Sequence, residues 1–149
     1  MYFSDLVPQE QSEWWFYEKN VIDESTICKI ENYIEGKELI SNQSMLDEYN
    51  KDIRSCEIHW MHEEGDEEEL MPIYTEVTYK MRQINDCMWK YIINGWEPFQ
   101  YTQYDESYGG HFNWHIDVHP KFNVDDSDPR KISFSVGLSN LDDYDGGDF

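Results

Sequence analysis

The side chains best suited to chemistry in this sequence lie in one short alternating segment, residues 111–119. If the segment is a strand, five polar residues fall on one face of it: His111, Asn113, His115, Asp117 and His119. Residues two apart on a strand point to the same side, so His115 and Asp117 can direct an imidazole and a carboxylate to one ion. Two histidines and a carboxylate with open coordination positions suit Fe(II) oxygen chemistry, and the third ligand then comes from elsewhere in the chain. The alternative is a polar strand face that contacts water and holds no metal.

A second group of possible ligands is the sequence His59-Trp-Met-His62, with Glu63 beside it. A zinc hydrolase needs such histidines on a helix, where residues at this spacing converge. Residues 53–61 instead alternate between two faces and predict a strand, which disfavours a hydrolase. The sequence also contains no Gly-x-Ser-x-Gly, phosphate-binding loop or Gly-x-Gly-x-x-Gly motif.

The first part of the chain, residues 1–95, is expected to supply helices that support these strands. Asp23 or Ser25 caps a helix that has apolar residues at positions 27, 30, 33 and 34 and ends at Gly36. Residues 37–51 give no clear prediction.

A longer helix is expected after Pro72, with apolar residues at positions 73, 74, 77, 81, 84, 88, 91 and 92 along one face and an end at Asn94-Gly95. The acidic run at residues 62–69 lies just before it. We interpret this run as a solvated loop and helix N-terminus rather than as a cation site.

The second part, residues 96–149, changes to a period of two and predicts strands. They span residues 99–104, 111–119 and 131–139, with turns at 105–110, 120–129 and 142–147. Helices followed by a run of strands indicate the α+β class. Small residues at 133, 135 and 137 would leave a hollow beside the ligand-bearing face if both faces point inward.

Composition limits the partners. The chain has 149 residues, with 32 acidic and 11 basic side chains and a formal net charge of −21. Because nucleic acids and anionic membranes are bound by clustered basic residues, we expect neither partner. Aromatic residues make up 16% of the chain, which is typical of a folded protein rather than a disordered one.

The cysteines indicate the compartment. Cys28, Cys56 and Cys87 are odd in number and widely spaced, which fits neither a disulfide framework nor a zinc ribbon. The chain shows no signal-peptide pattern and no apolar run near the ~20 residues that span a bilayer. We therefore expect a cytoplasmic protein with a single domain over residues 1–149.

Four segments are ordered and spaced as in a known enzyme family: Phe99–Tyr104, Gly109–Asp117, Arg130–Ser139 and Asp145–Asp148. They resemble the 2-oxoglutarate/Fe(II)-dependent dioxygenases of the prolyl 4-hydroxylase type, in the form common in phages and bacteria. The tryptophan-rich start and the long helix are similar to that family as well. The resemblance implies a double-stranded β-helix, a jelly-roll variant with N-terminal helices that buttress one sheet.

The resemblance also implies an oxidoreductase that uses Fe(II), O₂ and 2-oxoglutarate to hydroxylate a C–H bond of peptidyl proline or of another peptide or small-molecule substrate. His115 and Asp117 correspond to the first two Fe(II) ligands. Tyr104 corresponds to a tyrosine that contacts 2-oxoglutarate, although a role as an aromatic core residue explains it equally well. Arg130 and Gly146-Gly147 correspond to structural positions. Ascorbate often keeps the iron of relatives reduced, and a phage-encoded member acts in the host cytoplasm.

Two features of the family are missing from the sequence. Relatives supply a third iron ligand, a histidine on a later strand, and then a Lys or Arg that pairs with the distal carboxylate of 2-oxoglutarate. Here no histidine follows His119 and no basic residue follows Lys131. We therefore expect a C-terminally truncated domain with an incomplete jelly roll and little 2-oxoglutarate turnover by the 149-residue form. The alternative is a non-catalytic acidic binding protein on a degenerate oxygenase fold.

Overall fold

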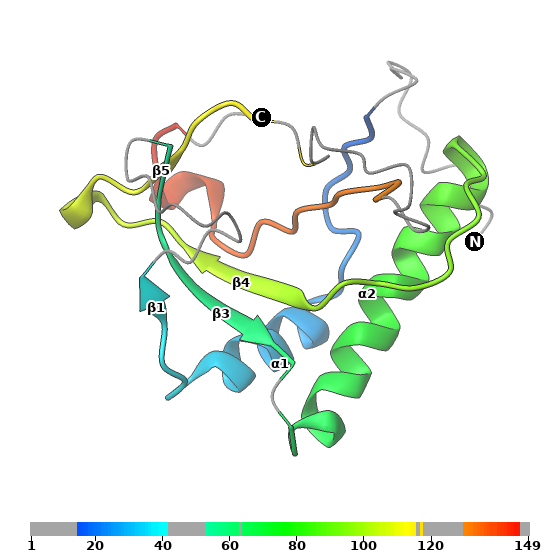
Figure 1. Ribbon diagram of the computed structural model, residues 1–149, viewed down its shortest axis with the longest axis horizontal. Helices are drawn as coiled ribbons and strands as arrows, with labels where there is room; N and C mark the ends of the chain where they lie inside the picture. The colour runs from blue at the N-terminus through cyan, green and yellow to red at the C-terminus, as the bar shows by residue number, and fades with distance from the viewer. Residues whose placement is uncertain (1–14, 42–52, 63, 116, 118–129, 147–149) are drawn as a thin grey trace, which may run out of the picture. The chain divides into compact units, whose positions relative to one another are not determined.

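The protein is described here from a computed structural model, over residues 15–41, 53–62, 64–115, 117 and 130–146 (Figure 1). The chain divides into two compact units, Met1–Ile116 and Asp117–Phe149. The described elements are helices and small antiparallel sheets, none of them closed, which confirms the α+β class. The double-stranded β-helix stays a prediction.

Helix α1, Glu24–Ile34, forms where the apolar spacing predicts it. Asp23 is the N-cap, and its carboxylate accepts a hydrogen bond from the backbone N–H of Thr26 at 2.7 Å. Thr26, Ile30 and Tyr33 make up the buried face of the helix. Gly36 adopts a φ of 81°, a left-handed conformation that few other residues accept, just after the helix ends.

Helix α2, Glu67–Met88, begins earlier than predicted, because Pro72 lies inside it rather than ahead of it. Proline removes one hydrogen bond of the helix. Two features offset that loss: Leu70 is buried, and Glu67, Glu68 and Glu69 place negative charge at the positive end of the helix dipole. The interpretation of these glutamates as a helix N-terminus is confirmed.

The predicted end of α2 at Asn94-Gly95 is wrong by about two turns. The side chain of Asn85 is buried and bonds the backbone of Tyr91 twice, accepting from its N–H at 3.0 Å and donating to its carbonyl at 2.9 Å. Lys90 takes a left-handed φ of 59°, which reverses the chain. Positions 91 and 92 consequently lie beyond the helix and are exposed. Neither helix in the described ranges combines the length and apolar character that crossing a bilayer requires.

The strands of the first unit form two antiparallel sheets. One has three strands in the order β1-β3-β4, and the other pairs β2 with β5. Their bounds are β1 Ile40–Ser41, β2 Arg54–Ser55, β3 Glu57–Met61, β4 Phe99–Gln103 and β5 His111–Phe112. Residues 54–61 therefore run almost continuously through both sheets, with Cys56 at the crossing, and the predicted strands over 53–61 and 99–104 are confirmed.

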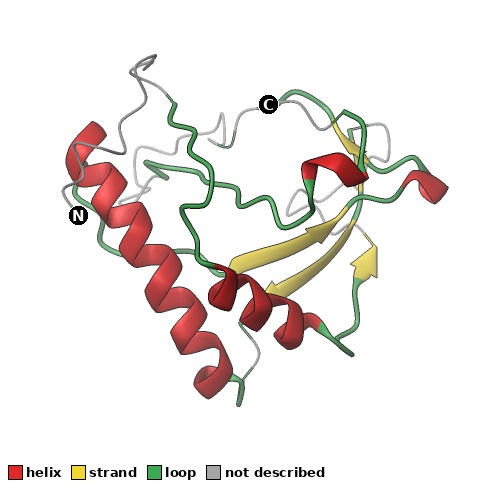
Figure 2. Cartoon of the chain, turned by 180° about the vertical axis from the view of Figure 1, so that it is seen from behind, coloured by secondary structure: helices red, strands yellow, loops and turns green. Residues whose placement is uncertain are grey.

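Helix α1 crosses one face of the three-stranded sheet, and helix α2 runs beside the sheet (Figure 2). The core contains Ile58 from β3 and Ile73 from α2, each 1% exposed. Tyr74 joins α2 to β3 and β4, since its hydroxyl donates to the Met61 carbonyl at 2.8 Å and accepts from the Phe99 N–H at 2.6 Å. Its ring also stacks on that of Phe99, with centroids 4.0 Å apart.

The predicted strand over residues 111–119 is wrong for residues 113–115, which form a loop; positions 116, 118 and 119 lie outside the described residues. The rings of Phe112 and His115 stack with centroids 3.6 Å apart, although three-residue spacing would put them on opposite faces of a strand. The strand stops because its partner does: the last bond of the ladder runs from the Asn113 N–H to the Ile53 carbonyl at 2.9 Å.

The second unit is described over residue 117 and residues 130–146. Exposure alternates from 131 to 139, with residues 132, 134, 136 and 138 half-buried and the small residues between them exposed. This alternation fits the predicted period of two, but no strand is formed within the described part of this unit. The exposed small residues do not face inward, which corrects the suggestion that they leave a hollow. A short 3₁₀ turn at Leu141–Asp143, capped by Asn140, occupies the predicted final turn; Gly147 lies outside the described residues.

Candidate functional site

His115 is exposed and lies in the loop after β5. Its Nδ1–H donates to the backbone carbonyl of Asn113 at 2.8 Å, while its ring lies flat on that of Phe112. In a neutral imidazole whose Nδ1 carries the proton, Nε2 holds the lone pair. Metal-binding histidines are commonly held in this way, with the second ring nitrogen bonded to a backbone carbonyl. The hydrogen bond at Nδ1 and the stacking on Phe112 therefore fix the orientation of the His115 ring.

Asp117 is the first residue of the second unit, and its side chain is exposed. Its backbone carbonyl accepts a hydrogen bond from Arg130 Nη1 at 3.3 Å. This contact gives Arg130 a structural partner, in agreement with the structural role that the resemblance implies for it. That His115 and Asp117 hold one ion stays a prediction.

Tyr104 follows β4 directly and is 47% exposed, so its ring is not a core side chain. Partial burial raises the pKa of its hydroxyl, and the Cys56 thiol contributes to the rise. Arg54 opposes both effects through its positive charge and a hydrogen bond. The exposure of the ring disfavours the interpretation of Tyr104 as a core residue, and its contact with 2-oxoglutarate stays a prediction.

Arg54 organises this region, and its role was not foreseen from the sequence. Its Nη2 donates to Gln100 Oε1 at 2.7 Å and lies 3.5 Å from Thr102 Oγ1, so it links β2 to β4, a strand of the other sheet. Its Cζ lies 4.6 Å from the centroid of the Phe112 ring, and the same ring stacks on that of His115. The Arg54 guanidinium thus interacts both with Tyr104 and with the Phe112 ring on which His115 stacks.

A signal for this arrangement is present in the sequence. Gln100, Thr102 and Tyr104 alternate along one strand and must share a face. Only the register shows that Arg54 reaches this face, because Arg54 pairs with Phe112 while Glu57, three residues later, pairs with Gln103 of β4.

Cys56 lies beside this group and is buried. Burial raises the pKa of its thiol; Arg54 partly opposes the rise, and Glu57 adds to it. Since the thiolate is the reactive form, this cysteine is a core residue rather than a nucleophile at neutral pH.

The two histidines of the alternative zinc site, His59 and His62, lie in different environments. His59 is buried in β3, donates from Nδ1 to the Glu38 carbonyl at 3.1 Å and packs edge-on against Tyr33. His62 lies exposed after the strand and donates to the Trp60 carbonyl at 3.3 Å. Glu63 lies outside the described residues. As predicted, the segment is not a helix, so the spacing that a zinc hydrolase requires is absent from it.

Across the described part of the chain, no three His, Cys, Asp or Glu side chains gather closely enough to hold a metal ion. The donor chemistry of His115 nevertheless fits a metal ligand, since its Nε2 lone pair is directed by the bond at Nδ1. Asp117 offers a carboxylate of the type that Fe(II) sites use.

No family model matches the chain, and neither the curated proteins nor the solved structures include a match to it.

Proposed function

We propose that this protein is a 2-oxoglutarate- and Fe(II)-dependent dioxygenase that hydroxylates a C–H bond of a peptide or small-molecule substrate, peptidyl proline among the candidates. The observation that carries the proposal is the orientation of His115, whose Nδ1–H donates a hydrogen bond to the backbone carbonyl of Asn113. In metal-binding histidines such a bond sets the tautomer in which Nε2 carries the lone pair, and here a carboxylate follows two residues later in the sequence.

In this proposal His115 and Asp117 hold the iron, which supplies the activation of O₂ when it is bound. Phe112 fixes the plane of the imidazole by stacking on it. The Tyr104 hydroxyl keeps its proton at neutral pH, because its pKa is raised from an already high value, and it can donate a hydrogen bond to a carboxylate of 2-oxoglutarate. Ascorbate would serve only to keep the metal reduced.

Metal binding tests the proposal without requiring turnover. We expect the parent protein to bind Fe(II) anaerobically, or Mn(II) as a substitute, in calorimetric titrations at 150 mM salt. His115→Ala and Asp117→Ala should each lower the affinity by more than about 100-fold, because loss of an outer-shell hydrogen bond alone costs 10–100-fold. Addition of 2-oxoglutarate to the Fe(II) protein should then produce the visible charge-transfer band of a chelated α-keto acid.

The acidic surface makes controls essential, since a net charge of −21 attracts cations without any site. His62→Ala and Asp86→Ala remove the same two side-chain types at exposed positions away from the candidate site, and each should leave the affinity within twofold of the parent. If all four variants bind the metal equally, the iron site is refuted. A protein that binds neither the metal nor 2-oxoglutarate would instead be the non-catalytic binding protein of the alternative interpretation.

A further inference from the structure

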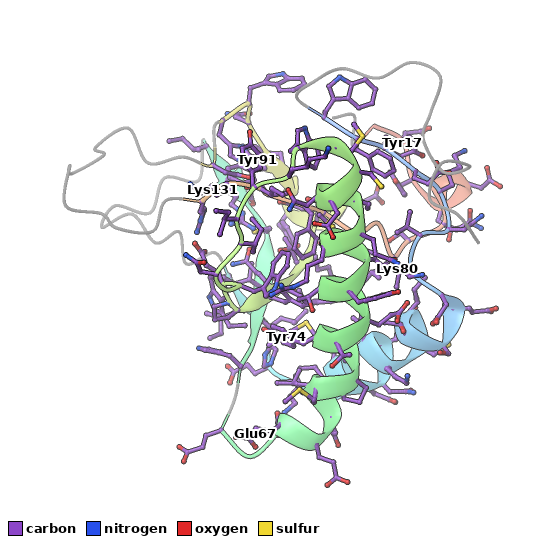
Figure 3. All side chains as sticks on the ribbon, turned by 90° about the vertical axis from the view of Figure 1, so that its right-hand side faces the viewer. Tyr17, Glu67, Tyr74, Lys80, Tyr91 and Lys131 are labelled. Carbon is purple, nitrogen blue, oxygen red and sulfur yellow. The ribbon has the colours of Figure 1, made fainter. Side chains whose placement is uncertain are left out.

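A cavity of about 290 Å³ lies where the end of β3 meets the first turns of α2, far along β4 from Tyr104. Glu67 and Tyr74, labelled in Figure 3, mark its place near the start of the helix. Its walls are mainly apolar and are formed by Met61, His62, Glu67, Leu70, Met71 and Tyr74. We call this cavity the α2 groove.

The floor of the α2 groove is rigid and its rim is open. Met61 and Leu70 are only 3% and 6% exposed, so they form a packed apolar floor. Tyr74 is fixed in the wall by its hydrogen bonds to Met61 and Phe99. Met71, by contrast, is 62% exposed at the rim. Methionine is long, flexible and polarizable, and it is common at surfaces that accept apolar side chains of varied shape.

One acidic residue, Glu67, lines the α2 groove, and further exposed carboxylates lie near it in the chain. The exposed carboxylates nearest to it in the chain are Glu64, Glu67, Glu68 and Glu69, and none of them forms an ion pair with any other described residue. Asp66, between them, is already paired with Lys37. An apolar floor beside the Glu67 carboxylate, in a segment with three further exposed glutamates that form no ion pair with described residues, favours a ligand that is apolar at one point and carries positive charge next to it.

We propose that the α2 groove binds a segment of a partner polypeptide that places one long apolar side chain, such as leucine, methionine or phenylalanine, between lysine or arginine residues. Ligand pockets for complete small molecules generally occupy about 300–1,000 Å³, so this cavity is of a size for one or two side chains. The basic neighbours would lie near Glu67 and the other exposed glutamates of this segment. The proposal is independent of the iron site and concerns a different part of the first unit.

A labelled peptide tests this surface in the metal-free full chain. The probe has one leucine between two pairs of lysines, and its binding is followed by fluorescence anisotropy at 150 mM salt. We expect Met71→Ser and Glu67→Gln each to weaken binding by 3- to 10-fold. The matched controls Tyr79→Ser and Asp86→Asn, at exposed positions farther along α2, should leave binding within 1.5-fold.

Two further measurements separate this site from simple charge attraction. Replacing the leucine of the probe with glycine should weaken binding at least 5-fold, and the intact probe should shift the methyl resonances of Met61 and Met71 in preference to those of other methionines. Equal binding of the glycine probe, or equal weakening by the control variants, overturns the proposal. Self-association that Met71→Ser abolishes, or binding to zwitterionic phosphatidylcholine vesicles in place of the peptide, also overturns it, because a second copy or a lipid surface would then occupy the groove.

Discussion

Arg54 connects Tyr104 and His115, the two residues of the candidate site that lie in the first unit. Its guanidinium touches the Phe112 ring, which in turn supports His115, and it also reaches Tyr104. Planar guanidinium groups suit this position because they can stack on an aromatic ring and donate within their own plane at the same time. A lysine would keep the charge at this position but lose the stacking and the directed hydrogen bonds.

The pKa of Tyr104 reports on this contact. Burial raises it, and Arg54 counteracts the rise because a positive charge favours the phenolate. Arg54→Met should therefore move the titration of Tyr104 to still higher pH, while Arg54→Lys should move it less. The measurement is the alkaline titration of the ¹³Cζ resonance of Tyr104, assigned with Tyr104→Phe.

Arg82→Met is the control for this titration. Arg82 also lies over an aromatic ring, that of Trp96 at 5.8 Å, but it contributes nothing to the pKa of Tyr104. A Tyr104 titration that is the same in Arg54→Met and in the parent would show that the two side chains do not interact in solution.

The turn between β4 and β5 connects Tyr104 to the strand that precedes His115. It contains a 3₁₀ turn at Glu106–Tyr108 and is closed by a hydrogen bond of 2.8 Å from the Gly110 N–H to the Asp105 carbonyl. A Cβ atom at Gly110 would lie 2.6 Å from the Asp105 nitrogen and 2.9 Å from Cα of Tyr104. Both neighbours are backbone atoms, so neither can rotate away.

Gly110→Ala should consequently destabilise the protein by about 1–3 kcal/mol, the usual cost of forcing extra atoms into a packed site. Urea unfolding followed by tryptophan fluorescence measures this change. Gly95→Ala is the matched control, since a Cβ there meets no atom within 4 Å, and it should change the free energy of unfolding by less than about 0.5 kcal/mol. Equal stability of the two variants would contradict the close approach at Gly110.

Local signals predicted the elements that depend on local interactions. Asp23 caps α1 as its position indicates, and the period of two in residues 99–103 is a strand, because capping and alternation act within a few residues. The end of α2 was missed because it depends on one buried amide, Asn85, which takes the backbone of Tyr91 away from the helix. Nothing in the local sequence distinguishes this asparagine from a solvent-exposed one.

The strand proposed for residues 111–119 failed at its centre for a different reason. Alternation shows which residues can share a face, but only a partner strand can hold them there. Here β2 offers two paired residues, and the chain then folds His115 back onto Phe112. The candidate ligands were thus identified by chemical type, whereas the way His115 is held depends on long-range pairing that the pattern cannot specify.

At the scale of the whole molecule, the main feature is unbalanced charge. Acidic side chains outnumber basic ones by 32 to 11, so at least 21 carboxylates cannot be neutralised within the chain. Two of the ion pairs among the described residues, Lys37–Asp66 and Lys80–Glu76, are partly exposed and therefore of small individual value. Repulsion among the remaining carboxylates opposes the compact state.

Salt should therefore stabilise this protein. Screening weakens repulsion and attraction alike, but with this imbalance repulsion is the larger quantity, and the Debye length falls from about 30 Å at 0.01 M to about 10 Å at 0.1 M. We expect Tm at pH 7 to rise by roughly 2–4 °C between 10 and 300 mM NaCl, equivalent to about 1 kcal/mol. KCl should give the same rise. A variant with Glu64, Glu67, Glu68 and Glu69 changed to glutamine should begin with a higher Tm and respond less to salt. A Tm that falls with added NaCl would mean that attractive pairs, and not the excess of carboxylates, dominate the electrostatic free energy of folding.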